Sequence, residues 1–379
     1  MSGMRFPNLR EGDPSRQMEC SLPLSLQREP SRTIAASQVP AQAPFRSHRR
    51  PKANLIQAQD TMSTANDAPP APQAPDWNSA MLRVKNPTPG WFEWALAQPF
   101  ASHFMDVSGC PIHYLRWATP AGHAPQRGLI FVHGGGAHAN WWRFLAPFFT
   151  REFKVAALDI SGMGDSGNRP EYNATLRAEE IRAVCAHAEL GERPFVVGHS
   201  FGGYMTMRYG ALFGAEAGGI VIADTPVNRP DPDGNRPTPS RPASVARYYP
   251  DVETGVDRFR LMPTQPCDNA YLVEFIARHS LRETEFGWTW KFDIDTMNGR
   301  RWDEPFHEYL QHAACRRALI YGEHSALLSR DTAHYMAELM GPQSPVVEIP
   351  AAHHHLTLDQ PLAFVSALRA ILGGWLASE

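Results

Sequence analysis

The sequence Val196-Val197-Gly198-His199-Ser200-Phe201-Gly202-Gly203 decides the fold that we expect for this chain. An apolar run from Pro194 to Val197 enters it as a buried strand would, and a helix-compatible stretch, Tyr204 to Phe213, follows. The Gly-x-Ser-x-Gly pattern between them is typical of a sharp strand-to-helix turn, because bulky residues two positions from the serine would collide across it. Such a turn exposes the serine hydroxyl, so Ser200 is a candidate nucleophile.

Strands and helices alternate on both sides of this turn. Strands are expected at 103–107, 111–117, 128–132, 153–160, 195–197, 219–223, 317–321 and 346–349, and helices at 90–96, 141–149, 174–188, 201–213, 330–340 and 361–375. The alternation predicts an α/β fold, with a mostly parallel central sheet and helices on both of its faces.

Composition divides the chain into four parts. Residues 1–75 are rich in Pro, Ser, Gln, Ala and Arg and are expected to form a disordered N-terminal extension. Residues 76–226 form the first part of the α/β core, and residues 317–379 form the second. The interval 227–316 is far too long for a loop and contains helical and aromatic stretches, so it is expected to be an inserted helical cap.

The overall balance of residues excludes several classes of protein. The chain has 379 residues, 43% of them hydrophobic, and a formal net charge of -3, so a large core is expected and neither nucleic acid nor an anionic membrane surface is indicated as a partner. No apolar run approaches a membrane span, and the N-terminus has no signal-peptide core. Five scattered cysteines argue against a disulfide framework and a structural zinc site, which favours a reducing, cytoplasmic location.

A glycine-rich stretch, His133-Gly134-Gly135-Gly136-Ala137-His138, follows the apolar strand at 128–132. Acyl transfer places negative charge on a carbonyl oxygen, and glycines allow backbone N–H groups to approach it. Gly135 and Phe201, the residue after the candidate nucleophile, are the predicted donors. The alternative interpretation is a glycine-rich turn without a ligand.

A histidine-rich stretch, Ala351-Ala352-His353-His354-His355, follows the last predicted strand. From there a histidine could reach the serine and act as its base, because its pKa lies near neutrality. A metal site is not predicted, since adjacent loop residues rarely bind one ion and no supporting carboxylate spacing is present. Asp359 is expected to cap the helix that begins at Pro361.

Together these stretches resemble the α/β-hydrolase superfamily, in particular its capped, esterase-like members. The resemblance covers roughly residues 100–379 and includes Asp159-Ile160-Ser161-Gly162-Met163-Gly164-Asp165-Ser166 after the fourth strand. It implies that His354 is the base, although His353 then stands where the family has glycine, and His355 is the nearest alternative. It also implies an acid that orients the histidine.

The acid is the least regular part of the resemblance. Most relatives carry an aspartate after the strand at 317–321, where this chain has Ser325 or Ala326. A minority carry it one strand earlier, where this chain has Asp224. We therefore predict Asp224 as the acid, with Glu323, or no acid, as alternatives.

The chemistry implied is that of a serine hydrolase of carboxylic esters, lactones or thioesters, acting on a small molecule without a cofactor. Hydrolysis of a carbon–carbon bond in a diketone-like substrate and non-catalytic ligand binding remain alternatives, and the oligomeric state is not indicated. The pocket is expected to accept a medium-sized hydrophobic group, and basic residues that could bind a substrate carboxylate are His279, Arg282 and Lys291. The predicted pocket residues are Trp141, Trp142, His138, Trp288 and Trp290.

Overall fold

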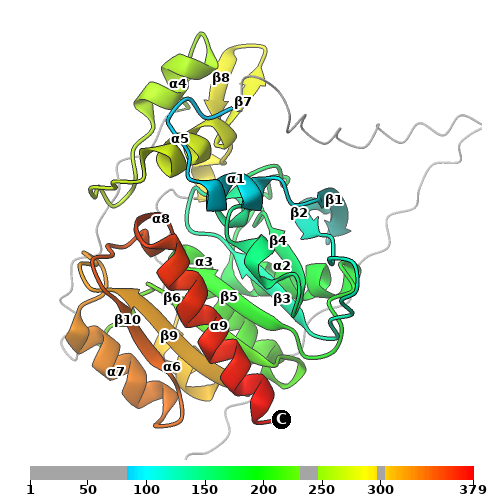
Figure 1. The fold of residues 1–379 in the computed structure, drawn as a ribbon, viewed down its shortest axis with the longest axis vertical. Helices are drawn as coiled ribbons and strands as arrows, with labels where there is room; N and C mark the ends of the chain where they lie inside the picture. Colours follow the sequence, from blue (N-terminus) through cyan, green and yellow to red (C-terminus); the bar gives the residue numbers. More distant parts are fainter. Residues whose placement is uncertain (1–82, 231–245, 297–303) are drawn as a thin grey trace, which may run out of the picture. The chain divides into compact units, whose positions relative to one another are not determined.

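The computed structural model describes residues 83–230, 246–296 and 304–379 (Figure 1). The predicted N-terminal extension, 1–75, lies outside the described residues. An eight-stranded sheet has the order β1-β2-β4-β3-β5-β6-β9-β10. β1 and β2 form an antiparallel hairpin, β2 is antiparallel to β4, and all other neighbours are parallel. The strands are β1 (Phe100–Val107), β2 (Cys110–Trp117), β3 (Gly128–Val132), β4 (Lys154–Leu158), β5 (Phe195–His199), β6 (Gly219–Ala223), β9 (Arg316–Gly322) and β10 (Val346–Ile349).

Helices cover both faces of this sheet, as the alternating pattern predicts. One core cluster joins the sheet to α1 and α9, and α9, drawn in red, crosses the front of the sheet in Figure 1. A second cluster joins the opposite face to α2, α3 and α7. Every residue of β3, β5 and β6 is buried, which explains their continuous apolar sequences. The helices are α1 (Gly90–Leu96), α2 (Ala174–His187), α3 (Phe201–Phe213), α7 (Arg330–Met340), α8 (Leu356–Asp359) and α9 (Pro361–Ala377).

One predicted helix differs in form. The stretch expected to be helical at 141–149 forms two short 3₁₀ turns, Ala139–Trp142 and Ala146–Phe149. Pro147 lies in the second of them and cannot donate a backbone hydrogen bond within an α-helix. The aromatic side chains of this stretch are held by packing in the core rather than by a regular helix.

The insertion between β6 and β9 contains a hairpin as well as helices. Its elements are α4 (Val252–Arg258), α5 (Ala270–His279), β7 (Leu281–Thr284), β8 (Gly287–Trp290) and α6 (Phe306–His312). The hairpin was not expected from the sequence. α4, α5 and the hairpin pack together, whereas α6 packs against α3 and α7 of the core. Among the residues that the structure describes, none of the helices is both long and apolar enough to cross a membrane.

Candidate active site

The Gly-x-Ser-x-Gly sequence forms a sharp turn between β5 and α3. Ser200 has φ 52° and ψ -120°, a conformation that costs a side-chain-bearing residue about 1–3 kcal/mol. A Cβ atom on Gly198 would lie 2.3 Å from Thr206 Oγ1, and one on Gly202 would lie 2.4 Å from the carbonyl oxygen of His133. These two glycines therefore permit the turn, which leaves Ser200 half-buried at the carboxyl end of the strand.

Ser200, His354 and Asp224 are joined by consecutive hydrogen bonds. His354 Nε2 lies 2.9 Å from Ser200 Oγ, and His354 Nδ1 lies 2.8 Å from Asp224 Oδ1. Because an ionised carboxylate can only accept, Nδ1 carries the proton and Nε2 accepts from the serine hydroxyl. The His354 side chain is 1% exposed and that of Asp224 is 0% exposed. The structure thus places the three predicted residues in one chain of contacts.

Donors on a neighbouring loop hold the Asp224 carboxylate. Its Oδ2 accepts from the Gly322 N–H at 2.8 Å, and its Oδ1 accepts from the Ser325 hydroxyl at 2.6 Å. Ser325 Oγ accepts in turn from the amides of Leu327 and Leu328, at 3.2 and 3.1 Å. The hydroxyl hydrogen is therefore directed at Asp224. The sequence did not reveal this role: Ser325 stands where most relatives carry the acid, and here it supports a carboxylate from the adjacent strand.

The two alternative residues, Glu323 and His355, make other contacts. A Glu323 oxygen accepts from the Ala351 N–H at 3.0 Å and lies 3.9 Å from His324 Nε2, and no contact joins Glu323 to His354 within the described residues. His355 is buried, and neither of its ring nitrogens makes a hydrogen bond to any described residue. Neither side chain therefore competes for the positions that Asp224 and His354 occupy.

The glycine-rich loop after β3 lies beside the serine. A Cβ atom on Gly134 would lie 3.4 Å from Ser200 Cβ. The Gly136 N–H points to Met163 Sδ at 3.3 Å, whereas the Gly135 N–H makes no hydrogen bond within the described parts of the chain. Phe201 begins α3 directly after Ser200. Both predicted oxyanion donors belong to the segments that flank Ser200.

Two buried histidines support this arrangement. His133 Nδ1 donates to the Gly134 carbonyl at 2.7 Å, and its Nε2 accepts from the Ile160 N–H at 3.0 Å. His199 Nε2 lies 2.9 Å from the backbone carbonyl of His354. Burial lowers the pKa of His133, and burial followed by the proximity of His354 lowers the pKa of His199 to about 3. Both rings are therefore neutral near pH 7.

The Asp159 carboxylate connects the glycine-rich loop to the sheet. It accepts from the Ala139 N–H at 2.5 Å, from the Asp165 N–H at 2.7 Å and from His113 Nδ1 at 2.7 Å. Burial alone would raise the pKa of Asp159, but the charge and the hydrogen bond of His113 lower it well below its usual range. These contacts give Asp159 a structural role in the turn after β4.

We expect Asp159→Asn to lower the free energy of unfolding by about 3 kcal/mol, because an amide cannot satisfy three buried donors. Urea denaturation measures the change, and Asp331→Asn, at an exposed position, is the matched control. The lowered pKa makes the contribution of Asp159 fully present above about pH 4 and lost as the pH falls further. Equal losses in both variants at neutral pH would contradict this role.

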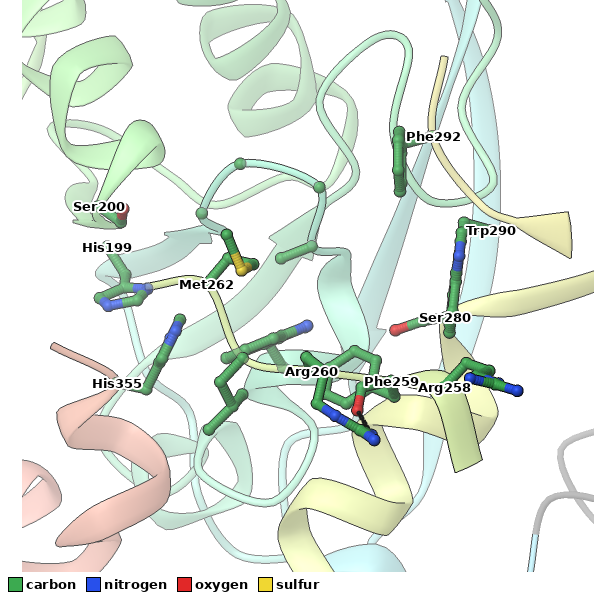
Figure 2. A pocket seen from close by; sticks show the side chains of 16 residues that line it. His199, Ser200, Arg258, Phe259, Arg260, Met262, Ser280, Trp290, Phe292 and His355 are labelled. Carbon is green, nitrogen blue, oxygen red and sulfur yellow. Dashed lines mark hydrogen bonds between the residues drawn. The ribbon is translucent and has the colours of Figure 1, made fainter. Parts of the chain in front are cut away.

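A cavity of about 460 Å³ opens beside Ser200, between the core and the insertion (Figure 2). The sequence did not single out the segment 258–262, which supplies one side of the cavity. Arg258 and Arg260 on this segment are exposed, so the cavity has a basic rim. Its other lining residues are mainly apolar and aromatic: Gly134, Gly135, Gly136, Ala137, Trp141, His199, Ser200, Phe259, Leu261, Met262, Ser280, Trp290, Phe292 and His355.

Of the five predicted pocket residues, only Trp141 and Trp290 line this cavity. Trp142 is instead a core residue, 1% exposed and stacked on Phe131 with ring centroids 4.7 Å apart. Adjacent residues of a turn point in different directions, and the sequence does not show which of Trp141 and Trp142 points into the cavity.

His138 and Trp288 were also predicted to line the pocket, and neither of them lines this cavity. His138 lies behind the lining residue Ser280, with its Nε2 2.9 Å from Ser280 Oγ. Trp288 lies two residues before Trp290 on β8, and its backbone pairs with Tyr249 of the insertion. Its side chain does not line the cavity.

The basic residues named as carboxylate ligands do not line the cavity either. His279 is buried and packs on Phe275 with ring centroids 4.1 Å apart. Lys291 Nζ forms an ion pair with Asp165 at 2.8 Å, and Arg282 is half-buried on β7. The basic groups at the cavity are those of the segment 258–262.

Asp359 is not the helix cap that the sequence suggested. Gln360 holds that position before Pro361 and makes no side-chain capping bond. The Asp359 carboxylate instead accepts from the His353 N–H at 2.7 Å and from Gln265 Nε2 at 2.9 Å. It therefore fixes the histidine-rich loop against the insertion.

Comparisons with known proteins agree with this architecture. The model of the alpha/beta hydrolase family matches residues 129–368. Esterase Rv0045c of Mycobacterium tuberculosis is 25% identical over 277 residues, which cover 70% of this chain and 88% of that protein. N-formylmaleamate deformylase of Pseudomonas putida is 32% identical over 139 residues, 36% of this chain and 48% of that enzyme.

Solved structures show the same fold. The thioesterase domain from the curacin biosynthetic pathway has a TM-score of 0.57 at 20% identity, with 71% of this chain and 99% of that domain covered. E-2-(acetamidomethylene)succinate hydrolase has a TM-score of 0.60 at 18% identity, with 73% and 100% covered. The predicted fold is confirmed: the chain belongs to the alpha/beta hydrolase family and is a hydrolase.

Proposed function

We propose that the protein hydrolyses carboxylic esters, lactones or thioesters, with Ser200 as nucleophile, His354 as general base and Asp224 as the acid that orients the histidine. The observation that carries the proposal is the unbroken hydrogen-bond chain from Ser200 Oγ through His354 to the Asp224 carboxylate. Asp224 fixes the tautomer in which Nε2 can accept a proton and stabilises the imidazolium that results.

In the first half-reaction His354 takes the hydroxyl proton while Ser200 Oγ attacks the carbonyl carbon. The amides of Gly135 and Phe201 stabilise the oxyanion. His354 then gives its proton to the leaving alcohol or thiol as the carbon–oxygen or carbon–sulfur bond breaks. In the second half-reaction the histidine activates a water, the acyl-enzyme is cleaved, and Ser200 recovers its proton.

The insertion acts as a cap and sets the substrate range. Trp290, Phe292 and Leu261 from the insertion line the cavity together with Trp141 and the glycine-rich loop, and such a lining suits a medium-sized hydrophobic acyl or alcohol group. The exposed guanidinium groups of Arg258 and Arg260 would suit a substrate that also carries a carboxylate. Because of this basic rim, the second candidate function is hydrolysis of acidic substrates. Carbon–carbon cleavage of a diketone-like acid belongs to this candidate.

A non-catalytic binding role is less well supported, because a binding protein has no need of a base hydrogen-bonded to both a serine and a buried carboxylate. The described cysteines are free thiols, compatible with the cytoplasmic location proposed from the sequence.

A fluorophosphonate probe tests the proposed function. We expect it to label Ser200 of the folded protein covalently, because an activated serine attacks phosphorus, and we expect no labelling of Ser200→Ala. Mass spectrometry of the peptide that contains Ser200 measures the result. A folded protein that remains unlabelled would favour the binding role. A panel of p-nitrophenyl esters, with and without a terminal carboxylate on the acyl group, then separates the two enzymatic candidates.

A further inference from the structure

Three histidines from two segments converge beside the cavity. One ring nitrogen from each of His199, His354 and His355 lies within 4.8 Å of the others, and all three side chains are buried. His199 and His355 line the cavity itself, as Ser200 does, and Figure 2 labels all three residues. The ring centroids are 5.0 Å apart for His199 and His354 and 4.9 Å apart for His354 and His355.

Two of these histidines are held as metal-binding histidines are held in known sites. Such residues usually donate one ring N–H to a carboxylate or a backbone carbonyl, which fixes the tautomer and frees the other nitrogen to bind. His354 Nδ1 donates to Asp224, and His199 Nε2 donates to the His354 carbonyl. The nitrogens left with lone pairs are therefore His354 Nε2 and His199 Nδ1.

His355 supplies an independent observation. It is 5% exposed, and neither ring nitrogen has a hydrogen bond of normal geometry within the described residues, although the backbone of Met262 lies nearby. Burial of an unpaired polar group costs about 1–3 kcal/mol. A ligand that bonded to His355 would recover this cost.

We propose that His199, His354 and His355 bind a divalent transition-metal ion, with Zn²⁺ as the best match, and that binding inhibits the enzyme. Zn²⁺ prefers imidazole nitrogens at 2.0–2.1 Å in tetrahedral geometry, which requires nitrogens roughly 3.3 Å apart. The ring nitrogens, now within 4.8 Å of one another, would move closer by rotation of the rings when the ion binds, and Ser200 Oγ or water would complete the coordination. The metal occupies His354 Nε2, so the nitrogen no longer accepts the serine proton. Inhibition, unlike binding, rests on the proposed function.

The sequence argument against a metal site concerned three consecutive histidines, and the first of them, His353, is not part of the cluster. His353 Nδ1 lies 3.3 Å from Asp359 Oδ2, and its ring packs beside His324 rather than in the cluster. The third ligand comes instead from His199 on β5. Only the fold brings His199 to this loop.

The test is a direct titration of the full-length protein with Zn²⁺ by calorimetry, together with Zn²⁺ inhibition of ester hydrolysis. We expect Zn²⁺ to bind and Mg²⁺, which prefers oxygen ligands, to bind far more weakly. His355→Leu and, separately, His199→Gln should each weaken Zn²⁺ binding at least about tenfold. Loss of a residue that only supports a ligand already costs about that much, and these two residues are proposed as ligands themselves. His353→Gln is the matched control and should leave Zn²⁺ affinity unchanged.

The outcomes separate this inference from the proposed function. Equal Zn²⁺ affinity of the wild type, His355→Leu and His199→Gln, each shown to be folded by thermal unfolding, would overturn the metal site. Weakening by His353→Gln as large as that by His355→Leu would do the same. Zn²⁺ binding that depends on His355 in a protein whose Ser200 cannot be labelled by the fluorophosphonate would support the metal site and reject the proposed function.

Discussion

Replacement of Ser200 by alanine is expected to lower kcat by about 10⁴- to 10⁶-fold, because Ser200 carries the hydroxyl that contacts His354, whereas the Ser280 hydroxyl, which also lines the cavity, donates to the Ile276 carbonyl. Initial rates with a p-nitrophenyl ester measure the loss, and titration of active sites in the wild type fixes the reference. Thermal unfolding of the variant should show little loss of stability. A residual rate within tenfold of the wild type would show that the reaction does not pass through Ser200.

The second large effect is expected for Asp224→Asn, with a loss of about 10⁴-fold in kcat. The asparagine amide would favour the tautomer in which His354 Nε2 carries the proton, and such a nitrogen cannot accept from the serine. Rates from pH 5 to pH 10 measure the loss. Glu323→Gln is the matched control: Glu323 is the alternative acid, and it makes no contact with His354 among the described residues. We expect this variant to change kcat less than twofold.

Ser325 permits a sharper version of this experiment. Its oxygen lies 2.6 Å from Asp224 Oδ1, the same atom that His354 Nδ1 contacts. An aspartate at position 325 would therefore bring a carboxylate close to that nitrogen. We expect the double variant Asp224→Asn/Ser325→Asp to recover at least about tenfold of the activity that Asp224→Asn loses.

A loss after Glu323→Gln as large as that after Asp224→Asn would reject the assignment of the acid.

Patterns that are local in sequence could be predicted, and contacts between distant segments could not. The elbow around Ser200 follows from glycine spacing, and the strand ends that carry Asp224 and His354 follow from apolar runs and the resemblance. All three lie after parallel strands, so the fold gathers them at one edge of the sheet. The support that Ser325 gives to Asp224 is different, because it depends on a hydroxyl direction set by two backbone amides.

The insertion also shows that contacts between distant segments could not be predicted from the sequence. Its irregular segment 258–262 has no periodic pattern, yet it forms one side of the cavity. The choice between Trp141 and Trp142 depends on how a 3₁₀ turn is oriented against the core. The cluster of His199 with His355 requires that β5 and the loop after β10 meet, which neither local sequence specifies.

The position of Asp224 directly after β6 has an evolutionary consequence. The proposed nucleophile Ser200 and the proposed acid Asp224 directly follow β5 and β6, which are joined through α3, and the insertion begins only after them. In relatives with the acid after the later strand, the chain must cross the insertion before it supplies the negative charge. Here the insertion can change in length or be exchanged without altering the spacing between serine and carboxylate. New substrate ranges could then arise by recombination of the insertion. After such an exchange, only the histidine-rich loop would still have to bring His354 into contact with Ser200 and Asp224.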